Sequence, residues 1–161
     1  MDKKLLQAYN SQIKNELYSA YLYLSMAAYL ESDNLPGFAQ WMKVQAKEEV
    51  SHAMKFFEFL NDRGERVILE AISKPPSDFS SPKEIFEESL KHEKKVTALI
   101  NALYELSKQV KDNTSLVFLG WFLNEQVEEE KNASAILEKI KMVKPGSGTL
   151  LMLDEKLGKR E

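Results

Sequence analysis

The chain has 161 residues, a length that fits one domain built around one hydrophobic core. Hydrophobic residues make up 43% of the sequence and charged residues 29%, which excludes a disordered chain. The formal net charge of -3 gives no reason to expect a nucleic-acid partner, and the lack of cysteine excludes disulfides, Cys-ligated zinc and iron–sulfur clusters.

Targeting and membrane segments are not indicated by the sequence. The first ten residues, MDKKLLQAYN, lack the apolar core and the cleavage site of a signal peptide. No stretch approaches the roughly 18 consecutive apolar residues of a membrane-spanning helix. We therefore expect a cytoplasmic protein without a membrane partner.

Turn-rich clusters are few, and the segments between them are long. Within each segment apolar residues recur every three or four positions, as Leu6, Tyr9 and Ile13 do near the N-terminus. This spacing predicts helices whose apolar faces meet in a bundle. The four predicted bundle helices span about 2–30, 36–63, 82–111 and 114–143.

The connections between these segments predict the topology. Short links make the first and second helices antiparallel, and likewise the third and fourth. The sequence from Ser81 to Glu84 matches a capping box with proline at the first helical position, so the third helix should start there. The link 64–81 is long enough to cross the bundle. After the turn-rich cluster at 144–148, the segment 147–159 should form a short fifth helix that packs against its own bundle or a neighbouring subunit, since it is too short to be stable alone.

The predicted fold class is therefore all-α: a four-helix bundle with a long crossover between helices two and three and a short C-terminal fifth helix. The whole chain, 1–161, should form a single domain.

Polar residues interrupt each apolar stripe near the middle of its helix, and in an antiparallel bundle they would meet in one layer. The interrupting residues are Glu16, Gln45, Glu49, His52, Glu93, Gln126 and Glu129. The four glutamates carry -4 when ionised, and no lysine or arginine shares their stripes. Two divalent cations would balance that charge; without them, crowding and burial would raise the glutamate pKa values.

The residue types in this layer narrow the choice of metal. Glu49 and His52 stand three residues apart on one helical face, so both can reach one ion. Many carboxylates with a single imidazole favour iron or manganese. A pair of ions bridged by Glu49 is the natural arrangement.

Four sequence motifs now resemble the haem-free bacterial and archaeal members of the ferritin family, in order and in spacing, over nearly the whole chain. They are NELYSAYLYLSM (15–26), KEEVSHAMKF (47–56), KHEKKVT (91–97) and WFLNEQVEEE (121–130). The resemblance implies a ferritin-like bundle that stores and detoxifies iron. It also implies a ferroxidase, an enzyme that oxidises Fe(II) with dioxygen and collects ferric oxide mineral inside a homo-oligomeric shell of 24 subunits.

The resemblance also implies roles for individual residues. Glu16, Glu49 and His52 would hold the first iron, with Glu49 as the bridge. Glu93 and Glu129 would hold the second iron, with Gln126 close by. Tyr23 matches a tyrosine beside the centre that acts as an electron donor. A third iron site would be formed by Glu48, Glu125 and Glu128, shared in part with Glu129.

Three departures from related patterns modify these expectations. Gln126 and Glu129 stand where bacterioferritins repeat Glu-x-x-His, so the second iron should be held less firmly. Val50 replaces the haem-ligating methionine of bacterioferritins, so we expect no haem. Leu116 and Leu119 occupy the positions of two acidic residues that line a threefold channel in animal ferritins, which leaves the path of iron into the shell open.

Two alternative functions remain at this stage. A non-catalytic scaffold could use the polar layer only to fix helix register. A substrate-oxidising di-iron enzyme is disfavoured, because such enzymes usually repeat Glu-x-x-His and have longer chains.

Outside the layer, His92 lies about 100° from the inward face and is predicted to be a solvent-exposed surface residue.

Overall fold

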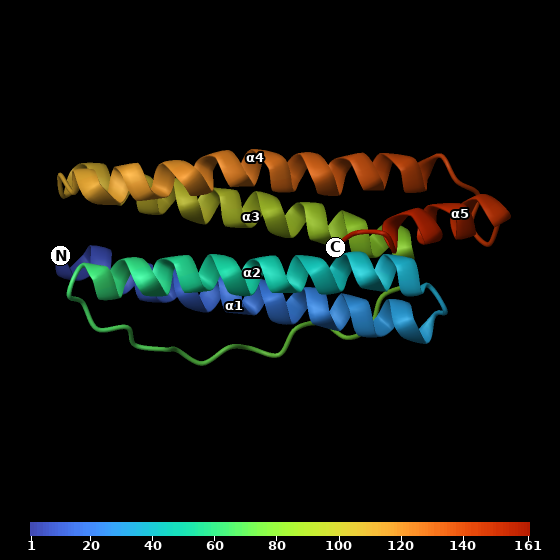
Figure 1. The fold of residues 1–161 in the computed structure, drawn as a ribbon, viewed down its shortest axis with the longest axis horizontal. Coiled ribbons are helices and arrows are strands. Elements are labelled where there is room, and N and C mark those ends of the chain that lie inside the picture. Colours follow the sequence, from blue (N-terminus) through green and yellow to red (C-terminus); the bar gives the residue numbers. More distant parts are fainter.

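Four long helices pack side by side as two antiparallel hairpins, and a fifth, short helix lies across one end (Figure 1). The structure is a computed structural model that describes all residues 1–161. The helices are α1 (Lys3–Ser32), α2 (Pro36–Asp62), α3 (Pro82–Gln109), α4 (Asn113–Lys141) and α5 (Gly148–Leu157). Their ends lie within two residues of the ends expected from the sequence. The predicted fold class is confirmed.

Side chains just before three of the helices satisfy backbone N–H groups that have no partner within the helix. The Asp2 carboxylate accepts from the first turn of α1, and Asp112 does the same for α4. At α3, Ser81 accepts from the Glu84 backbone N–H at 3.2 Å, as the capping box predicts. The Glu84 carboxylate, however, accepts from the Ser80 backbone N–H at 2.5 Å, one residue before the expected partner.

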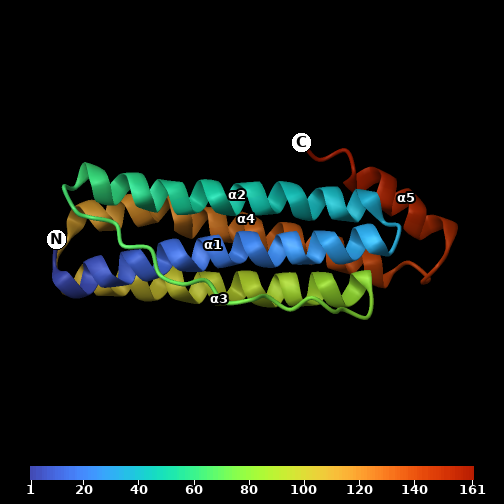
Figure 2. The same cartoon turned by 90° about the horizontal axis from the view of Figure 1, so that it is seen from below.

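The crossover between α2 and α3 runs the length of the bundle, beside α1 (Figure 2). Polar contacts attach it to α1 along that path. The backbone N–H of Ile68 donates to Asn10 Oδ1 at 2.8 Å, and Lys14 Nζ lies 2.6 Å from Glu70 Oε2. Further along, Ser25 Oγ donates to the Pro76 carbonyl at 2.6 Å. The crossover therefore brings the second hairpin back alongside the first.

Helix α5 docks onto the start of α2. Leu35, the residue before α2, offers no side-chain cap, and Asp154 of α5 supplies one: its Oδ1 accepts from the Phe38 backbone N–H at 2.8 Å. The contact is so close that a Cβ on Gly37 would lie 1.8 Å from the Asp154 carbonyl oxygen. Only glycine at position 37 permits this docking.

Two apolar clusters fill the bundle on either side of the polar layer. One lies toward α5 and includes Tyr23, Phe38 and Phe86, and the other lies toward the N-terminus and includes Phe56 and Phe122. Between them the polar layer is sealed from solvent at both ends. None of the helices is long and apolar enough to cross a membrane.

Candidate metal centre

Four helices each contribute polar side chains to one buried layer between the apolar clusters. None of the six central side chains belongs to a residue more than 5% exposed: Glu16 from α1, Glu49 and His52 from α2, Glu93 from α3, and Gln126 and Glu129 from α4. The inward positions expected from the helical stripes are therefore the buried ones. No lysine or arginine is among the buried residues.

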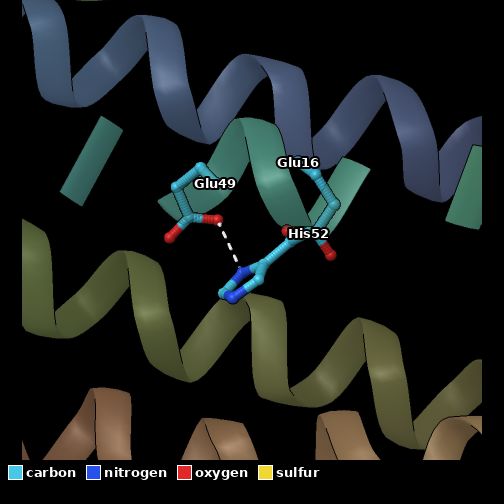
Figure 3. A group of neighbouring side chains, drawn as sticks. All are labelled: Glu16, Glu49 and His52. Atoms are coloured by element: carbon cyan, nitrogen blue, oxygen red, sulfur yellow. Dashed lines mark ion pairs between the residues drawn. The ribbon is translucent and has the colours of Figure 1, made fainter. Parts of the chain in front are cut away.

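The first group of converging side chains comes from α1 and α2 (Figure 3). Glu16, Glu49 and His52 each offer one ligand atom, and these atoms all lie within 4.8 Å of one another. His52 Nδ1 is 3.5 Å from Glu49 Oε2, as the i, i+3 spacing allows. Gln12, one turn before Glu16, donates from Nε2 to Glu16 Oε1 at 2.7 Å and holds that carboxylate in place. This arrangement can hold one metal ion.

A second group uses the other side of the same imidazole. His52, Glu125 and Glu129 also offer ligand atoms within 4.8 Å of one another, with His52 Nε2 3.8 Å from Glu125 Oε1. Glu125 lies at the edge of the layer, its side chain 29% exposed. The group therefore joins the buried layer to the surface.

Glu93 is held by its neighbours on two sides. The Tyr23 hydroxyl donates to Glu93 Oε1 and lies 3.2 Å from Ser89 Oγ. The Gln126 amide donates to Glu93 Oε2 at 3.2 Å. Tyr23 is thus in direct contact with a carboxylate of the layer, and Gln126 acts as a donor to that carboxylate.

The remaining predicted third-site residues lie outside both groups. Glu48 is half-buried and forms an ion pair with Arg160, from the segment after α5. Glu128 is exposed on α4. Glu125 is therefore grouped with Glu129, while Glu48 lies near enough for its charge to raise the pKa of Glu129.

Burial dominates the electrostatics of the layer. It raises the pKa of Glu16 and of Glu49 well above the usual range, and the charges of neighbouring glutamates add to the effect. Burial also raises the pKa of Glu93, while the bond from Tyr23 opposes the shift. For Glu129, burial and then the charge of Glu93 raise the pKa to about 7. The four carboxylates therefore resist ionising together unless positive charge joins them.

The prediction that His92 is a solvent-exposed surface residue is wrong. His92 is half-buried, its Nε2 lies 2.8 Å from Ser19 Oγ, and burial lowers its pKa to about 4. It lines a cavity of about 280 Å³ together with Pro76 and Phe79 of the crossover. The helical angle alone placed His92 outside the bundle interior correctly, but the crossover covers this face.

Several residues that support the layer were missed from the sequence. Gln12 could have been found, since it lies one turn from Glu16 on the same face. Ser89 likewise precedes Glu93 by four residues on α3. Arg160 gives no such signal, because it contacts Gln45 and Glu48 from more than 110 positions away in the sequence.

Comparisons with known proteins agree with this geometry. The ferritin-like domain model matches residues 6–143. Bacterial non-heme ferritins from Staphylococcus aureus (strain USA300) and Staphylococcus epidermidis are each 39% identical to the chain over 160 residues, which is 99% of this chain and 96% of theirs. The crystal structure of an open pore ferritin from the archaeon Archaeoglobus fulgidus is 46% identical and superposes with a TM-score of 0.98, covering 100% of this chain and 99% of that one. An engineered closed form of the same archaeal ferritin gives the same TM-score. The family resemblance noted in the sequence is confirmed, and the chain belongs to the ferritin family.

Proposed function

We propose that this protein stores and detoxifies iron in the cytoplasm. Residues 1–161 act as a single di-iron domain with ferroxidase activity: they bind Fe(II) as substrate, dioxygen oxidises it, and ferric oxide mineral collects inside a shell of 24 copies. Membership of the ferritin family supports this proposal. The names of the staphylococcal relatives, which specify a non-heme ferritin, support the expectation that no haem is bound.

The observation that carries the proposal is the charge of the buried layer. Four glutamates from four helices, each no more than 5% exposed, meet in an interior that contains no lysine or arginine. An uncompensated layer of this kind costs free energy, because carboxylates must either stay protonated or remain charged without water. Two Fe(II) ions would supply the missing positive charge.

The geometry supports a division of the ligands between two ions. Glu16, Glu49 and His52 would hold the first Fe(II), since their ligand atoms already converge. Glu93 and Glu129 would hold the second, with Glu49 shared between the two. Gln126 would be a weaker neutral neighbour. A site with one imidazole and several carboxylates suits iron.

The chain's own residues then govern oxidation of the substrate pair. Each Fe(II) gives one electron to dioxygen. Tyr23, which donates a hydrogen bond to Glu93, would orient that carboxylate and act as an electron donor beside the pair. Glu125 lies at the edge of the layer and would pass iron toward a third site completed by Glu48, Glu128 and Glu129.

Alanine substitutions test the proposal. Glu49→Ala or His52→Ala should each lower the initial rate of Fe(II) oxidation at least about ten-fold. The loss of a residue that only hydrogen-bonds to a metal ligand already lowers metal affinity that much, and these two variants remove a ligand itself. Glu58→Ala, an exposed glutamate on the same helix, is the matched control and should oxidise Fe(II) at the unchanged rate. Unchanged rates in both ligand variants would contradict a ferroxidase.

An anaerobic Fe(II) titration separates the ferroxidase from the scaffold alternative. A scaffold whose polar layer only fixes helix register would bind no stoichiometric Fe(II). We expect stoichiometric binding of two Fe(II) ions per chain, with the second ion held less firmly than the first.

A further inference from the structure

The segment after α5 turns back over α2, as Figure 2 shows, and its arginine reaches toward the metal centre. The Arg160 guanidinium lies 4.4 Å from the centre of the Trp41 ring, and the Arg160 side chain as a whole is 21% exposed. Its Nη1 donates to Gln45 Oε1 at 2.9 Å, and its Nη2 pairs with Glu48. One side chain thus joins an aromatic ring, an amide and a carboxylate on three successive turns of α2.

Gln45 connects this surface contact to the buried layer. Its Nε2 donates to Glu129 Oε2 at 2.7 Å and to Glu49 Oε1 at 3.3 Å. Gln45 itself is only 1% exposed, so its amide has no alternative partner in solvent. A continuous series of hydrogen bonds therefore runs from Arg160 to two carboxylates of the metal centre.

The chemistry of the partners fixes the direction of this series. A guanidinium has only donors, so it can bond only to the oxygen of the Gln45 amide. That bond turns the NH2 group of Gln45 inward, toward Glu129 and Glu49, whose side chains can only accept once they are ionised as metal ligands. If the amide were reversed, its oxygen would face these ionised carboxylates, and acceptors would oppose one another.

We propose that Arg160 is a positioning residue for the metal centre: by holding the Gln45 amide in one orientation, it keeps a donor aimed at Glu129 and Glu49. The inference rests on the proposed function, because the carboxylates so oriented are the proposed iron ligands. Outer partners that orient ligating carboxylates commonly contribute ten-fold or more to metal affinity.

The docking of α5 sets the reach of Arg160. Asp154 anchors α5 to the first turn of α2, and Arg160 follows six residues later. The Gly37–Asp154 contact and the Arg160–Gln45 contact therefore lie along the same stretch of α2. A shift of α5 would therefore displace Arg160 and, through Gln45, the carboxylates of Glu129 and Glu49.

Titration with Co(II), a probe that dioxygen does not consume, tests the inference in the full-length protein. Arg160→Gln should weaken Co(II) binding about ten-fold and alter the visible absorption bands of the bound Co(II), which report ligand geometry. Arg160→Lys keeps the charge beside Glu48 but loses the planar fork, and should restore only part of the affinity. Lys159→Gln, an exposed neighbour that pairs only with Glu155, is the matched control and should bind as wild type does.

A double-mutant cycle shows whether Arg160 acts through Gln45. In a Gln45→Leu background, Arg160→Gln should cause no further loss of Co(II) affinity. Circular dichroism of every variant verifies that the helices are retained, and the absorption bands of Arg160→Lys give a second readout if Arg160→Gln unfolds.

The outcomes that overturn the inference are distinct from failure of the proposed function. Wild-type affinity and spectrum in Arg160→Gln, or an equal loss with and without Gln45, would overturn the positioning role while leaving the metal centre intact. Absence of stoichiometric Co(II) and Fe(II) binding by the wild-type protein would overturn the proposed function, and the inference with it.

Discussion

Glu129 shows, at the scale of a single residue, why the buried layer is unusual. It is 5% exposed, and its pKa is raised to about 7 by burial and by the charge of Glu93. Gln45 opposes this shift by donating a hydrogen bond. In the metal-free protein, Glu129 is therefore partly protonated near neutral pH, and a cation must displace that proton to bind.

This raised pKa predicts how the stability of the metal-free protein depends on pH. Below the ordinary value of 4.5, Glu129 is neutral in both the folded and the unfolded chain. Between 4.5 and about 7 the unfolded chain ionises first, so the Glu129 contribution to stability is lost as pH rises, by about 3 kcal/mol at most. Thermal unfolding with a chelator present, at several pH values from 5 to 7.5, measures this loss.

The pH dependence of wild-type stability must be compared with that of Glu129→Gln, whose side chain at position 129 cannot ionise. His92 acts in the opposite sense, because its pKa is lowered to about 4 and its folded form gains stability as pH rises toward the ordinary value of 6.5. The difference between wild type and Glu129→Gln removes the His92 contribution. A difference that does not change with pH would contradict the raised pKa.

Added Co(II) should stabilise the wild-type protein more at pH 7 than at pH 5.

At the scale of the helices, the structure separates what sequence reasoning can reach from what it cannot. The four long helices and the polar layer follow from the period of the apolar residues, because that period decides which face is buried. The start of α3 follows from local chemistry at Ser81 and Pro82. The cap that Asp154 provides for α2 could not be predicted, since its partner Phe38 lies 116 positions away. The prediction that His92 is exposed was wrong for the same reason, because the crossover, a segment distant in the sequence, covers it.

Substitution of two glycines by alanine should change the stability of the protein in opposite directions. In Gly37→Ala the added Cβ would lie 1.8 Å from a backbone oxygen of α5, so α5 must move away and the cap from Asp154 is lost. We expect a loss of roughly 1–3 kcal/mol in unfolding free energy. In Gly120→Ala the Cβ meets nothing within 4 Å inside α4, so helix propensity should add about 1 kcal/mol.

Chemical denaturation of the two variants measures both effects under the same conditions. Gly120→Ala is the control for the general effect of adding a methyl group to a helix. If Gly37→Ala were as stable as wild type, α5 would not be anchored through this contact. The same variant should also weaken Co(II) binding, if Arg160 depends on α5 for its position.

At the scale of the whole molecule, apolar side chains remain on the surface of the single chain. Tyr21, Leu24, Val50 and Met54 are each between 43% and 51% exposed on α1 and α2. Leu24 and Val50 line one surface hollow, and exposed apolar groups that lie together are typical of contacts between subunits. They support the proposed assembly into a shell.

The mass of the purified protein in solution tests that assembly. Light scattering after size-exclusion chromatography should give a particle near 24 times the 18.5 kDa mass of the chain. Leu24→Arg should reduce the fraction of this particle, because it introduces a charge beside Lys43 and Lys47 on a face that would be buried. A wild-type protein that runs as a single chain would contradict the shell.

The crossover is the only covalent connection between the two hairpins, which lie side by side in Figure 1. Glu16 and Glu49 belong to one half and Glu93 and Glu129 to the other. Iron bound between these carboxylates would link the two hairpins. A chain cleaved by a protease in the crossover would then keep its two halves associated, and an iron-loaded subunit would resist dissociation of its hairpins more than a metal-free one.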